Sequence, residues 1–296
     1  MKLTYKVIDN YTTVKQIIKN EFHISKRLLI KLKQNNRITK NNESVYINEP
    51  VKIGDIIEVD LSFEEESENI IATNISINII YEDDAYIVIN KQPKIETHPT
   101  VANFENTLAN GVKYYFQQNN INKKIRPVNR LDKETSGIII FAKNEYIQEQ
   151  LIHQMKNGVF EKEYLAIVEG KLEQQKGTIN APIKRKEGSI LERCVSADGQ
   201  NAITEYEVLQ TRAQYTLLRC KLKTGRTHQI RVHMSYIGHP IVSDFLYGSR
   251  NTKIDRQALH SEKIKFIHPI TKEYVCYTCD LPQDMKTVIR RRKWSN

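Results

Sequence analysis

A polar loop that runs directly into a buried strand places the strongest constraint on the fold. Residues 138–142 read IIIFA, an unbroken apolar run, and the loop NRLDKETSG stands immediately before it. A short continuous run of this kind is typical of a strand covered on both faces. The next segment, NEYIQEQLIHQM, has the apolar spacing of a helix. We therefore expect a central strand that presents a polar loop, and loops held by a rigid sheet are where functional groups concentrate.

The large domain around this strand is predicted to span residues 75–285. INIIYEDDAYIVINKQ reads as two strands about an acidic turn, and TLANGVKYYFQQNN reads as a helix. The strand-rich pattern predicts an α+β fold with a central antiparallel sheet and a cleft lined by its loops. A length of 296 residues, 40% of them hydrophobic, is enough for one large domain or two unequal ones.

A smaller unit is predicted at residues 12–61. Its first helix would bury Val14, Ile17, Ile18 and Phe22, and Ser25 stands at the N-cap position of a second helix, KRLLIKLKQNN. Strand-like pieces follow in RIT, SVYIN, VKI and IIEVDL. The cations of the second helix, taken alone, fit phosphate contacts and a solvated helix face equally well. They are Lys26, Arg27, Lys31 and Lys33.

The order of elements in this unit resembles the S4 RNA-binding module. The resemblance covers TVKQIIKNEFHISKRLLIKLKQNNRITKNN and the later VKIGDIIEV. It implies that the helix pair binds structured RNA and that Lys26, Arg27, Lys31 and Lys33 contact it. The acidic stretch after it, with Glu64, Glu65, Glu66 and Glu68, is interpreted as a solvated linker over residues 62–74.

The composition of the chain indicates which kinds of binding partner and which cellular location to expect. A formal net charge of +10 favours a polyanion such as RNA. We find no apolar run of membrane-spanning length and no signal-peptide pattern at the N-terminus, so we expect a cytoplasmic protein that does not enter membranes. We also expect a monomer.

The loop before the central strand contains an arginine and an aspartate two residues apart, Arg130 and Asp132. In extended chain these side chains share a face. Thr135, Ser136 and Gly137 can form a tight turn behind them. A bare pair of this kind is more often a structural ion pair than a catalytic site.

The longer segment RLDKETSGIIIFAKN resembles the signature loop of the RluA/RluD-type pseudouridine synthases, which act on ribosomal and transfer RNA. INKQPKIETHP, FEKEYLAIVEG and LKTGRTHQIRVHMSYIGHPIVSDFLYG resemble further motifs of that family in the same order. The resemblance implies isomerisation of uridine to pseudouridine without a cofactor. It places the catalytic aspartate at Asp132, the active-site tyrosine at Tyr164 and the active-site arginine at Arg226. Where the family usually carries histidine before the R-L-D, this chain has Asn129.

The resemblance also suggests roles for these residues. Arg226 is expected to pair with Asp132 and orient it. Tyr164 is expected to pack against the uracil and to relay the proton lost from C5. Arg130 is expected to fill the space that a flipped uridine leaves, or to hold a phosphate. The substrate is expected to be large-subunit ribosomal RNA, with transfer RNA as the alternative substrate. The alternative function is that of a catalytically inactive RNA-binding or ribosome-assembly protein.

Three other features of the sequence could indicate a metal-binding or RNA-binding site, but each is better explained by ordinary structure. Cys276 and Cys279 form a C-x-x-C inside a strand pattern, where residues three apart face opposite ways, so no metal is expected there. The histidines of THQIRVHMSYIGH lack the glutamate of a metalloprotease motif and are expected to hydrogen-bond locally or contact RNA. The alternation in THQIRVHM fits a strand or the approach to a helix. The basic tail at residues 286–296, with Arg290 to Lys293 beside Trp294, is interpreted as a soluble end rather than an RNA clamp.

Overall fold

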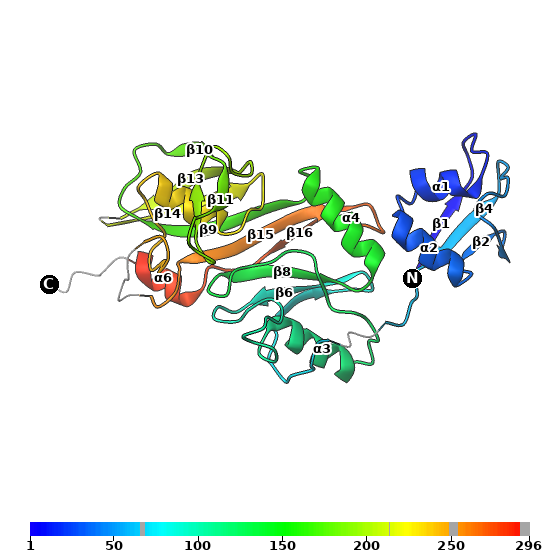
Figure 1. Cartoon of the computed structure of the whole chain (residues 1–296), viewed down its shortest axis with the longest axis horizontal. Coiled ribbons are helices and arrows are strands. Elements are labelled where there is room, and N and C mark those ends of the chain that lie inside the picture. Colours follow the sequence, from blue (N-terminus) through cyan, green and yellow to red (C-terminus); the bar gives the residue numbers. More distant parts are fainter. Residues whose placement is uncertain (66–68, 213, 249–253, 291–296) are drawn as a thin grey trace.

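The structure is a computed structural model that describes residues 1–65, 69–212, 214–248 and 254–290. It is elongated, with a small N-terminal domain at one end and a large domain built on one wide sheet (Figure 1). Within these residues we find no helix that is long and apolar enough to cross a membrane.

The small domain packs two helices on a four-stranded sheet. Its strands are β1 (Lys2–Lys6), β2 (Ile38–Lys40), β3 (Glu43–Ser44) and β4 (Ile56–Asp60), in the order β1-β4-β2-β3, and its helices are α1 (Val14–Asn20) and α2 (Lys26–Gln34). Ser25 caps α2 as predicted, because its Oγ accepts a hydrogen bond from the backbone N–H of Leu28 at 3.2 Å. The sheet begins earlier than the predicted range of 12–61, since β1 pairs with β4 along its whole length. The VKI segment forms no strand, and of the segment SVYIN only Ser44 belongs to one.

The large domain contains a ten-stranded sheet. Its main path runs β10-β13-β14-β9-β15-β8-β6-β5, with β16 also on β15 and β7 on β8. The strands are β5 (Ile79–Glu82), β6 (Tyr86–Lys91), β7 (Arg126–Pro127), β8 (Ser136–Ala142), β9 (Glu161–Glu169), β10 (Lys176–Asn180), β13 (Ile203–Thr211), β14 (Tyr215–Leu222), β15 (Leu259–Ile267) and β16 (Tyr274–Thr278). All pairs are antiparallel except β15 with β8. The α+β prediction is confirmed, but the sheet is mixed at its centre.

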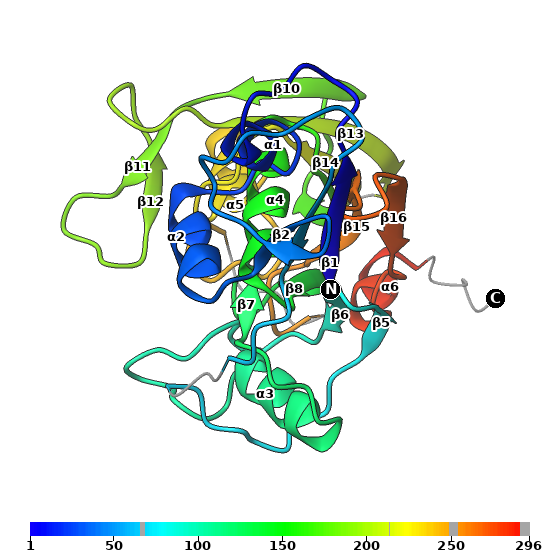
Figure 2. The ribbon, with the colours of Figure 1, turned by 90° about the vertical axis from the view of Figure 1, so that its right-hand side faces the viewer.

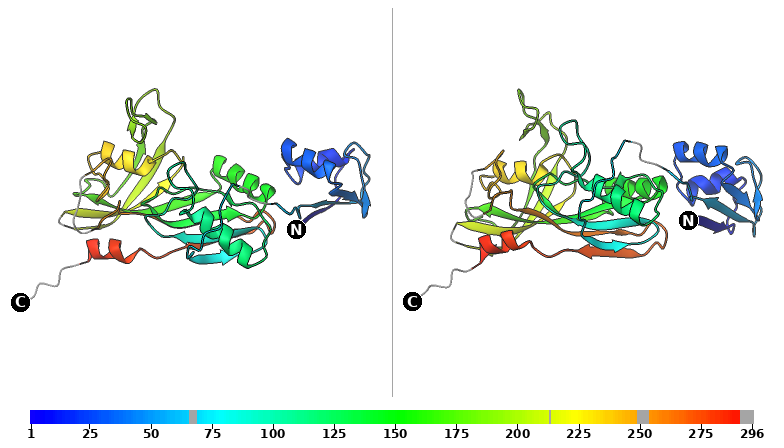
Figure 3. Two further views of the ribbon diagram at one scale, coloured as in Figure 1. Left: turned by 60° about the horizontal axis from the view of Figure 1, so that its bottom comes forward. Right: turned by 90° about the horizontal axis from the view of Figure 1, so that it is seen from below.

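Helices and a hairpin complete the large domain. They are α3 (Leu108–Gln118), α4 (Glu145–Lys156), α5 (Gln229–Tyr236), α6 (Gln283–Ile289) and the hairpin of β11 (Ile183–Arg185) and β12 (Arg193–Val195). α4, α5 and the hairpin lie on the same side of the sheet (Figure 3), and the hairpin stands away from the rest of the domain (Figure 2). The central run IIIFA is the fully buried part of β8, as predicted.

A close backbone approach joins β8 to β15. Gly137 has a φ of +113°, and a Cβ at this position would lie 2.3 Å from the carbonyl oxygen of Ser261. Only glycine fits both requirements. The parallel pair at the centre of the sheet therefore depends on the residue that ends the polar loop.

The small domain contacts the large one through α2 with its N-cap and through the segment after β4. Arg27 forms an ion pair with Glu145 at 2.7 Å, and Ser25 donates a hydrogen bond to Glu149 at 2.8 Å. Glu65 is buried between Lys31 and Arg126, with its carboxylate 2.7 Å from Arg126. The interpretation of the acidic stretch as a solvated linker is thus wrong for Glu65, which joins the two domains. Glu66 and Glu68 lie outside the described residues.

Candidate active site

A cleft of about 690 Å³ opens beside the polar loop. Its volume lies in the range of roughly 300–1,000 Å³ that is typical of ligand sites. Its walls come from residues 96–100, from the loop at 127–132, from β9 and α4, and from the segment at 222–228 that leads into α5. The predicted catalytic residues all line this one cleft, namely Arg130, Asp132, Tyr164 and Arg226.

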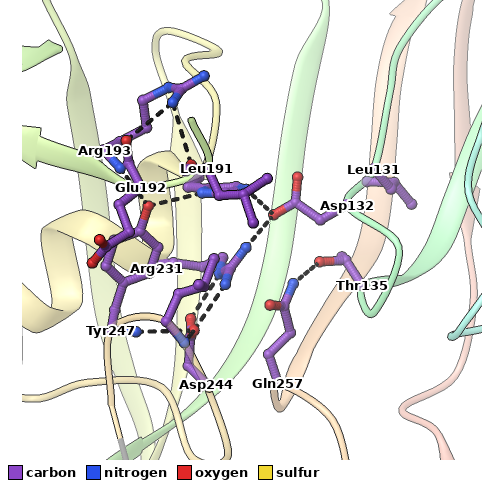
Figure 4. A network of polar contacts seen from close by, with 12 residues as sticks. Leu131, Asp132, Thr135, Leu191, Glu192, Arg193, Arg231, Asp244, Tyr247 and Gln257 are labelled. Atoms are coloured by element: carbon purple, nitrogen blue, oxygen red, sulfur yellow. Dashed lines mark hydrogen bonds and ion pairs between the residues drawn. The ribbon is translucent and has the colours of Figure 1, made fainter. Parts of the chain in front are cut away.

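The carboxylate of Asp132 is held by Arg231. Nη1 of Arg231 donates to Oδ2 of Asp132 at 3.0 Å, while Nε and Nη2 hold Asp244 at 2.7 and 2.8 Å (Figure 4). Asp244 is fully buried, whereas the side chain of Asp132 remains 31% exposed to the cleft. Burial alone would lower the pKa of Arg231, but the hydrogen bond and charge of Asp244 outweigh it and the pKa is raised. The guanidinium is thus a permanent cation whose plane is fixed before substrate arrives.

Arg226 does not make this contact, so the predicted pairing of Arg226 with Asp132 is wrong. Its Nε donates to the carbonyl of Asn201 at 3.0 Å and its Nη1 to Gln200 at 3.1 Å. The side chain is exposed on the rim of the cleft. A position on the rim suits contact with RNA rather than orientation of a carboxylate.

The sequence did not reveal the role of Arg231, because the pattern of THQIRVHM fits a strand and the approach to a helix equally well. The segment is the helix α5, with His228 at its N-cap in the left-handed region at φ 59°. On a helix, residues three apart lie on one face, so His228 and Arg231 both reach Asp132. The Nε2 atom of His228 lies 3.8 Å from Oδ2 of Asp132.

His228 is also connected to the hairpin. Its Nδ1 lies 2.8 Å from the hydroxyl of Tyr247, which accepts a hydrogen bond from the backbone N–H of Arg193 at 2.8 Å. A hydroxyl that accepts from Arg193 is free to donate its own hydrogen to Nδ1, which leaves the imidazole proton on Nε2, facing Asp132. Burial lowers the pKa of His228, which favours this neutral form.

Tyr164 lies on β9 beside Asp132 and is 6% exposed. Burial raises the pKa of its hydroxyl, and the nearby charge of Asp132 adds to that effect. The phenol therefore stays protonated near neutral pH, with its ring forming part of the cleft wall.

Side chains from other elements fix the backbone of the polar loop. Thr97 donates to the carbonyl of Leu131 at 3.1 Å. Lys91 donates to the carbonyl of Lys133 at 3.0 Å, and Arg256 donates to that of Glu134 at 3.3 Å. These bonds hold the main chain on both sides of Asp132, so the carboxylate is presented by a rigid loop.

Lys91 is fully buried at the end of β6. Its Nζ also donates to the carbonyls of Gln92 at 3.0 Å and Ile95 at 2.9 Å. Burial lowers the pKa of Lys91 to about 7. Three carbonyl acceptors nevertheless match the three N–H bonds of an ammonium group, which a neutral amine lacks. Lys91 thus ties the 92–95 loop to the loop that carries Asp132.

Asn129 replaces the histidine that the resemblance leads one to expect. Its amide donates to the carbonyl of Ile138 at 3.2 Å and accepts from the N–H of Ile140 at 2.9 Å. Both bonds attach the start of the loop to the edge of β8. The local geometry here is secured by backbone contacts that the amide group can make.

The predicted RNA contacts of α2 divide into two pairs. Lys31 is bound by Glu65 and Arg27 by Glu145, so both face the large domain. Lys26 and Lys33 are exposed and lack an ion pair among the residues described. Arg27 keeps 82% of its side chain exposed despite its ion pair, whereas Lys31 keeps 34%. The predicted contact of all four cations with RNA stays a prediction.

The described residues contain no group of three or more histidine, cysteine or acidic side chains that could hold a metal ion. Cys276 is exposed and Cys279 is half-buried, with its Sγ 3.1 Å from Nε2 of His260. His233 bonds Thr204 and Ala181, and His239 bonds the carbonyl of Glu169. The predicted basic tail at residues 286–296 begins too early, because residues 286–289 belong to α6 and Val288 is buried. The residues after Arg290 lie outside the described residues.

Comparison with known proteins identifies a family for both domains. Residues 85–236 match the RNA pseudouridylate synthase family, and residues 1–57 match the N-terminal domain of the RluD ribosomal pseudouridine synthase. An uncharacterized RNA pseudouridine synthase of Bacillus subtilis, YjbO, is 41% identical over 94% of this chain and 98% of its own. The ribosomal large subunit pseudouridine synthase D of Blochmanniella floridana is 35% identical over 86% of each chain.

Solved structures agree in the fold. The human RNA pseudouridylate synthase domain containing 1 superposes with a TM-score of 0.59 and 25% identity, over 71% of this chain and 85% of that one. The cleft, its paired carboxylate and these matches lead to one conclusion: the chain belongs to the RNA pseudouridine synthase family and is an RluD-type enzyme that acts on RNA.

Proposed function

We propose that this enzyme isomerises specific uridines of large-subunit ribosomal RNA, with Asp132 as its catalytic carboxylate and without a cofactor. The observation that carries the proposal is the carboxylate itself. It is held by Arg231 at 3.0 Å and stays 31% exposed to a cleft large enough for a nucleotide. A fixed carboxylate facing an open cleft is arranged for reaction with a bound substrate rather than for stability alone.

The chemistry needs few groups. The N1–C1′ bond of uridine breaks, the uracil turns, and C5 bonds to C1′, while C5 loses a proton and N1 gains one. Atoms and electrons balance within the nucleotide, so neither an oxidant nor a group donor is required. Positive charge develops at C1′ when the glycosidic bond breaks, and Asp132 can stabilise that charge or attack covalently.

Arg231 orients Asp132 rather than touching the sugar. Because Asp244 already occupies two of its donors, Arg231 offers Asp132 a single directed hydrogen bond. One oxygen of Asp132 is thereby directed at the arginine, and the other is left for the substrate.

Tyr164 supplies a ring against which the uracil can pack. Its hydroxyl carries a proton at neutral pH, so it acts first as a donor and accepts the C5 proton only as it passes its own to another base. Arg130 is exposed at the mouth of the cleft, two residues from Asp132. There it can fill the position of a uridine that has left its stack.

The choice of ribosomal RNA rests on the relatives. Several are named ribosomal large subunit pseudouridine synthase D, and the N-terminal 57 residues match the corresponding domain of RluD. We assign this S4-like domain to RNA capture, mainly through Lys26 and Lys33, and we place the enzyme in the cytoplasm as a monomer.

The test is a purified assay. RNA from a strain that lacks the enzyme is fractionated into ribosomal and transfer RNA, each fraction is incubated with the protein alone, and pseudouridine is mapped. We expect new pseudouridine in large-subunit ribosomal RNA, and none with Asp132→Asn, which keeps shape but loses charge and nucleophilicity. Product only in transfer RNA would overturn the ribosomal assignment, and turnover by Asp132→Asn near the wild-type rate would overturn the role of Asp132.

A further inference from the structure

The charged residues at the start of β9 alternate between two very different faces. Glu161 and Glu163 point to the side of the sheet away from the cleft, where they pair with Lys221 at 2.8 Å and Lys263 at 3.3 Å. Lys162 and Tyr164 point to the opposite side, since successive strand residues face opposite ways, and both line the cleft. Lys162 therefore shares a face with Tyr164.

Lys162 differs from Lys221, Lys223 and Lys263, each of which pairs with a glutamate, in having no ion-pair partner among the described residues. Among the described residues no carboxylate lies within ion-pair distance of its ammonium, and no acceptor binds it. Its side chain is half-buried, and burial lowers its pKa with no neighbouring charge to oppose the effect. A desolvated cation without a partner is costly, so it is retained where a ligand completes it.

The surroundings of Lys162 are open on the side of the cleft. Its Nζ would lie 3.3 Å from a Cβ at position 225, so Gly225 leaves the ammonium uncovered. Lys162 also lines a second groove, of about 500 Å³, that adjoins the cleft along Val128, Met155 and Leu222. Four further cations line this groove, namely Lys156, Lys221, Lys223 and Arg226. Lys221 is paired there with Glu161, which lines the edge of the groove as well. The site is thus continuous with a cationic path leading away from Asp132.

We propose that Lys162 binds a phosphodiester group of the RNA directly beside the target uridine and thereby holds that nucleotide against Tyr164 and Asp132. The inference rests on the proposed function, because it takes the cleft to be the site of reaction. Phosphate is the anionic group of RNA, and a charge-assisted bond to it replaces the hydration that Lys162 has lost. The groove beyond Lys162 receives the strand that continues from this phosphate.

A neutral Lys162 could instead accept the proton that leaves C5, and the two roles predict different results. A phosphate contact needs only a cation, so arginine can replace lysine. A general base must be deprotonated, which an arginine does not achieve. Lys162→Arg and Lys162→Gln together therefore separate the two roles.

The experiment measures turnover and binding on the same ribosomal RNA from a strain that lacks the enzyme. Binding is measured in the Asp132→Asn background over a range of salt concentrations. We expect Lys162→Gln to weaken binding and raise KM at least about tenfold, and to lower the log–log salt slope by roughly 0.7 to 0.9. Lys162→Arg should restore most of both. The matched control is Lys263→Gln, which removes a paired lysine from the opposite face and should leave binding and turnover unchanged.

Each outcome decides one question. Unchanged binding and salt slope in Lys162→Gln overturn the phosphate contact. Normal binding with equal loss of kcat in both variants also overturns it and assigns Lys162 as the base. If the wild-type protein forms no pseudouridine, the proposed function fails, and the binding measurement still decides whether Lys162 contacts RNA. Thermal melting of each variant controls for folding.

Discussion

The guanidinium of Arg231 lies between two carboxylates that it holds in different ways, with Asp244 bound through two nitrogens and Asp132 through one. Asp244 is fully buried and Asp132 faces the cleft. The buried partner fixes the plane of the guanidinium, and the third nitrogen then has one direction in which to donate. The position of the reactive carboxylate is thus set from inside the protein, by a residue that substrate does not reach.

Arg231→Lys should lower kcat by about a hundredfold, because a lysine cannot bind two carboxylates along fixed directions and Asp132 then loses its orientation. The KM for RNA should change little. Steady-state kinetics measure both values. Arg226→Ala is the matched control on the rim of the cleft, and it should raise KM more than it lowers kcat. If Arg226→Ala mainly lowered kcat and Arg231→Lys mainly raised KM, the residue that orients Asp132 would be Arg226 instead of Arg231.

Lys91→Met should destabilise the protein and slow turnover together. The substitution leaves three carbonyls without their donor, that of Ile95 buried and those of Gln92 and Lys133 partly buried. A fully buried group that loses its partner costs about 1–3 kcal/mol. The loop that carries Asp132 is then free to shift. Urea unfolding gives the stability, and kcat on ribosomal RNA gives the activity. Lys94→Met is the control and should behave like wild type, since within the described part of the chain Lys94 pairs only with the exposed Asp255.

Glu65→Gln should loosen the contact between the two domains. A glutamine side chain keeps the shape of the glutamate but lacks the negative charge that Lys31 and Arg126 share. Limited proteolysis should therefore cut the segment between the domains faster, while the large domain melts as before. Glu64→Gln is the neighbouring control. Equal cleavage rates in both variants would show that Glu65 does not hold the domains together.

Acid should destabilise the protein through His260, which is fully buried against Ser136 and Cys279. Burial lowers its pKa from 6.5 to about 4. Between these values the unfolded chain binds a proton that the folded protein refuses, so the free energy of unfolding falls as the pH falls. The contribution is complete above about pH 6.5 and is lost towards pH 4. Urea unfolding across this window should show a shallower pH dependence in His260→Gln than in wild type, and parallel curves would contradict the assignment.

The loop of Asp132 could be predicted from its local pattern, and Tyr164 could be placed in the site because its segment resembles a long motif of the family. The arginine that pairs with Asp132 could not be predicted in this way. Arg226 and Arg231 stand five residues apart, and which of them reaches Asp132 depends on where α5 begins and on the buried Asp244. A short segment with mixed spacing does not settle that choice.

The same limit applies to the cations of α2. Their spacing shows that they lie on the surface of a helix, but Arg27 and Lys31 face the large domain because Glu145 and Glu65 meet them there. That arrangement depends on how two domains pack, and no local pattern in either one records it. Charge periodicity predicts an exposed face without predicting what covers it.

The place of β15 in the sheet has a consequence for the order in which the enzyme matures during synthesis. β5, β6 and β8 form one side of the sheet and β9, β14, β13 and β10 form the other, and β15 joins them. Asp132 comes from the first side, whereas Tyr164 and Arg231 come with the second. A nascent chain therefore carries every one of these side chains before they can meet. We therefore expect activity only after residues 259–267 have left the ribosome and closed the sheet, so that an incomplete chain does not modify RNA at the site where it is made.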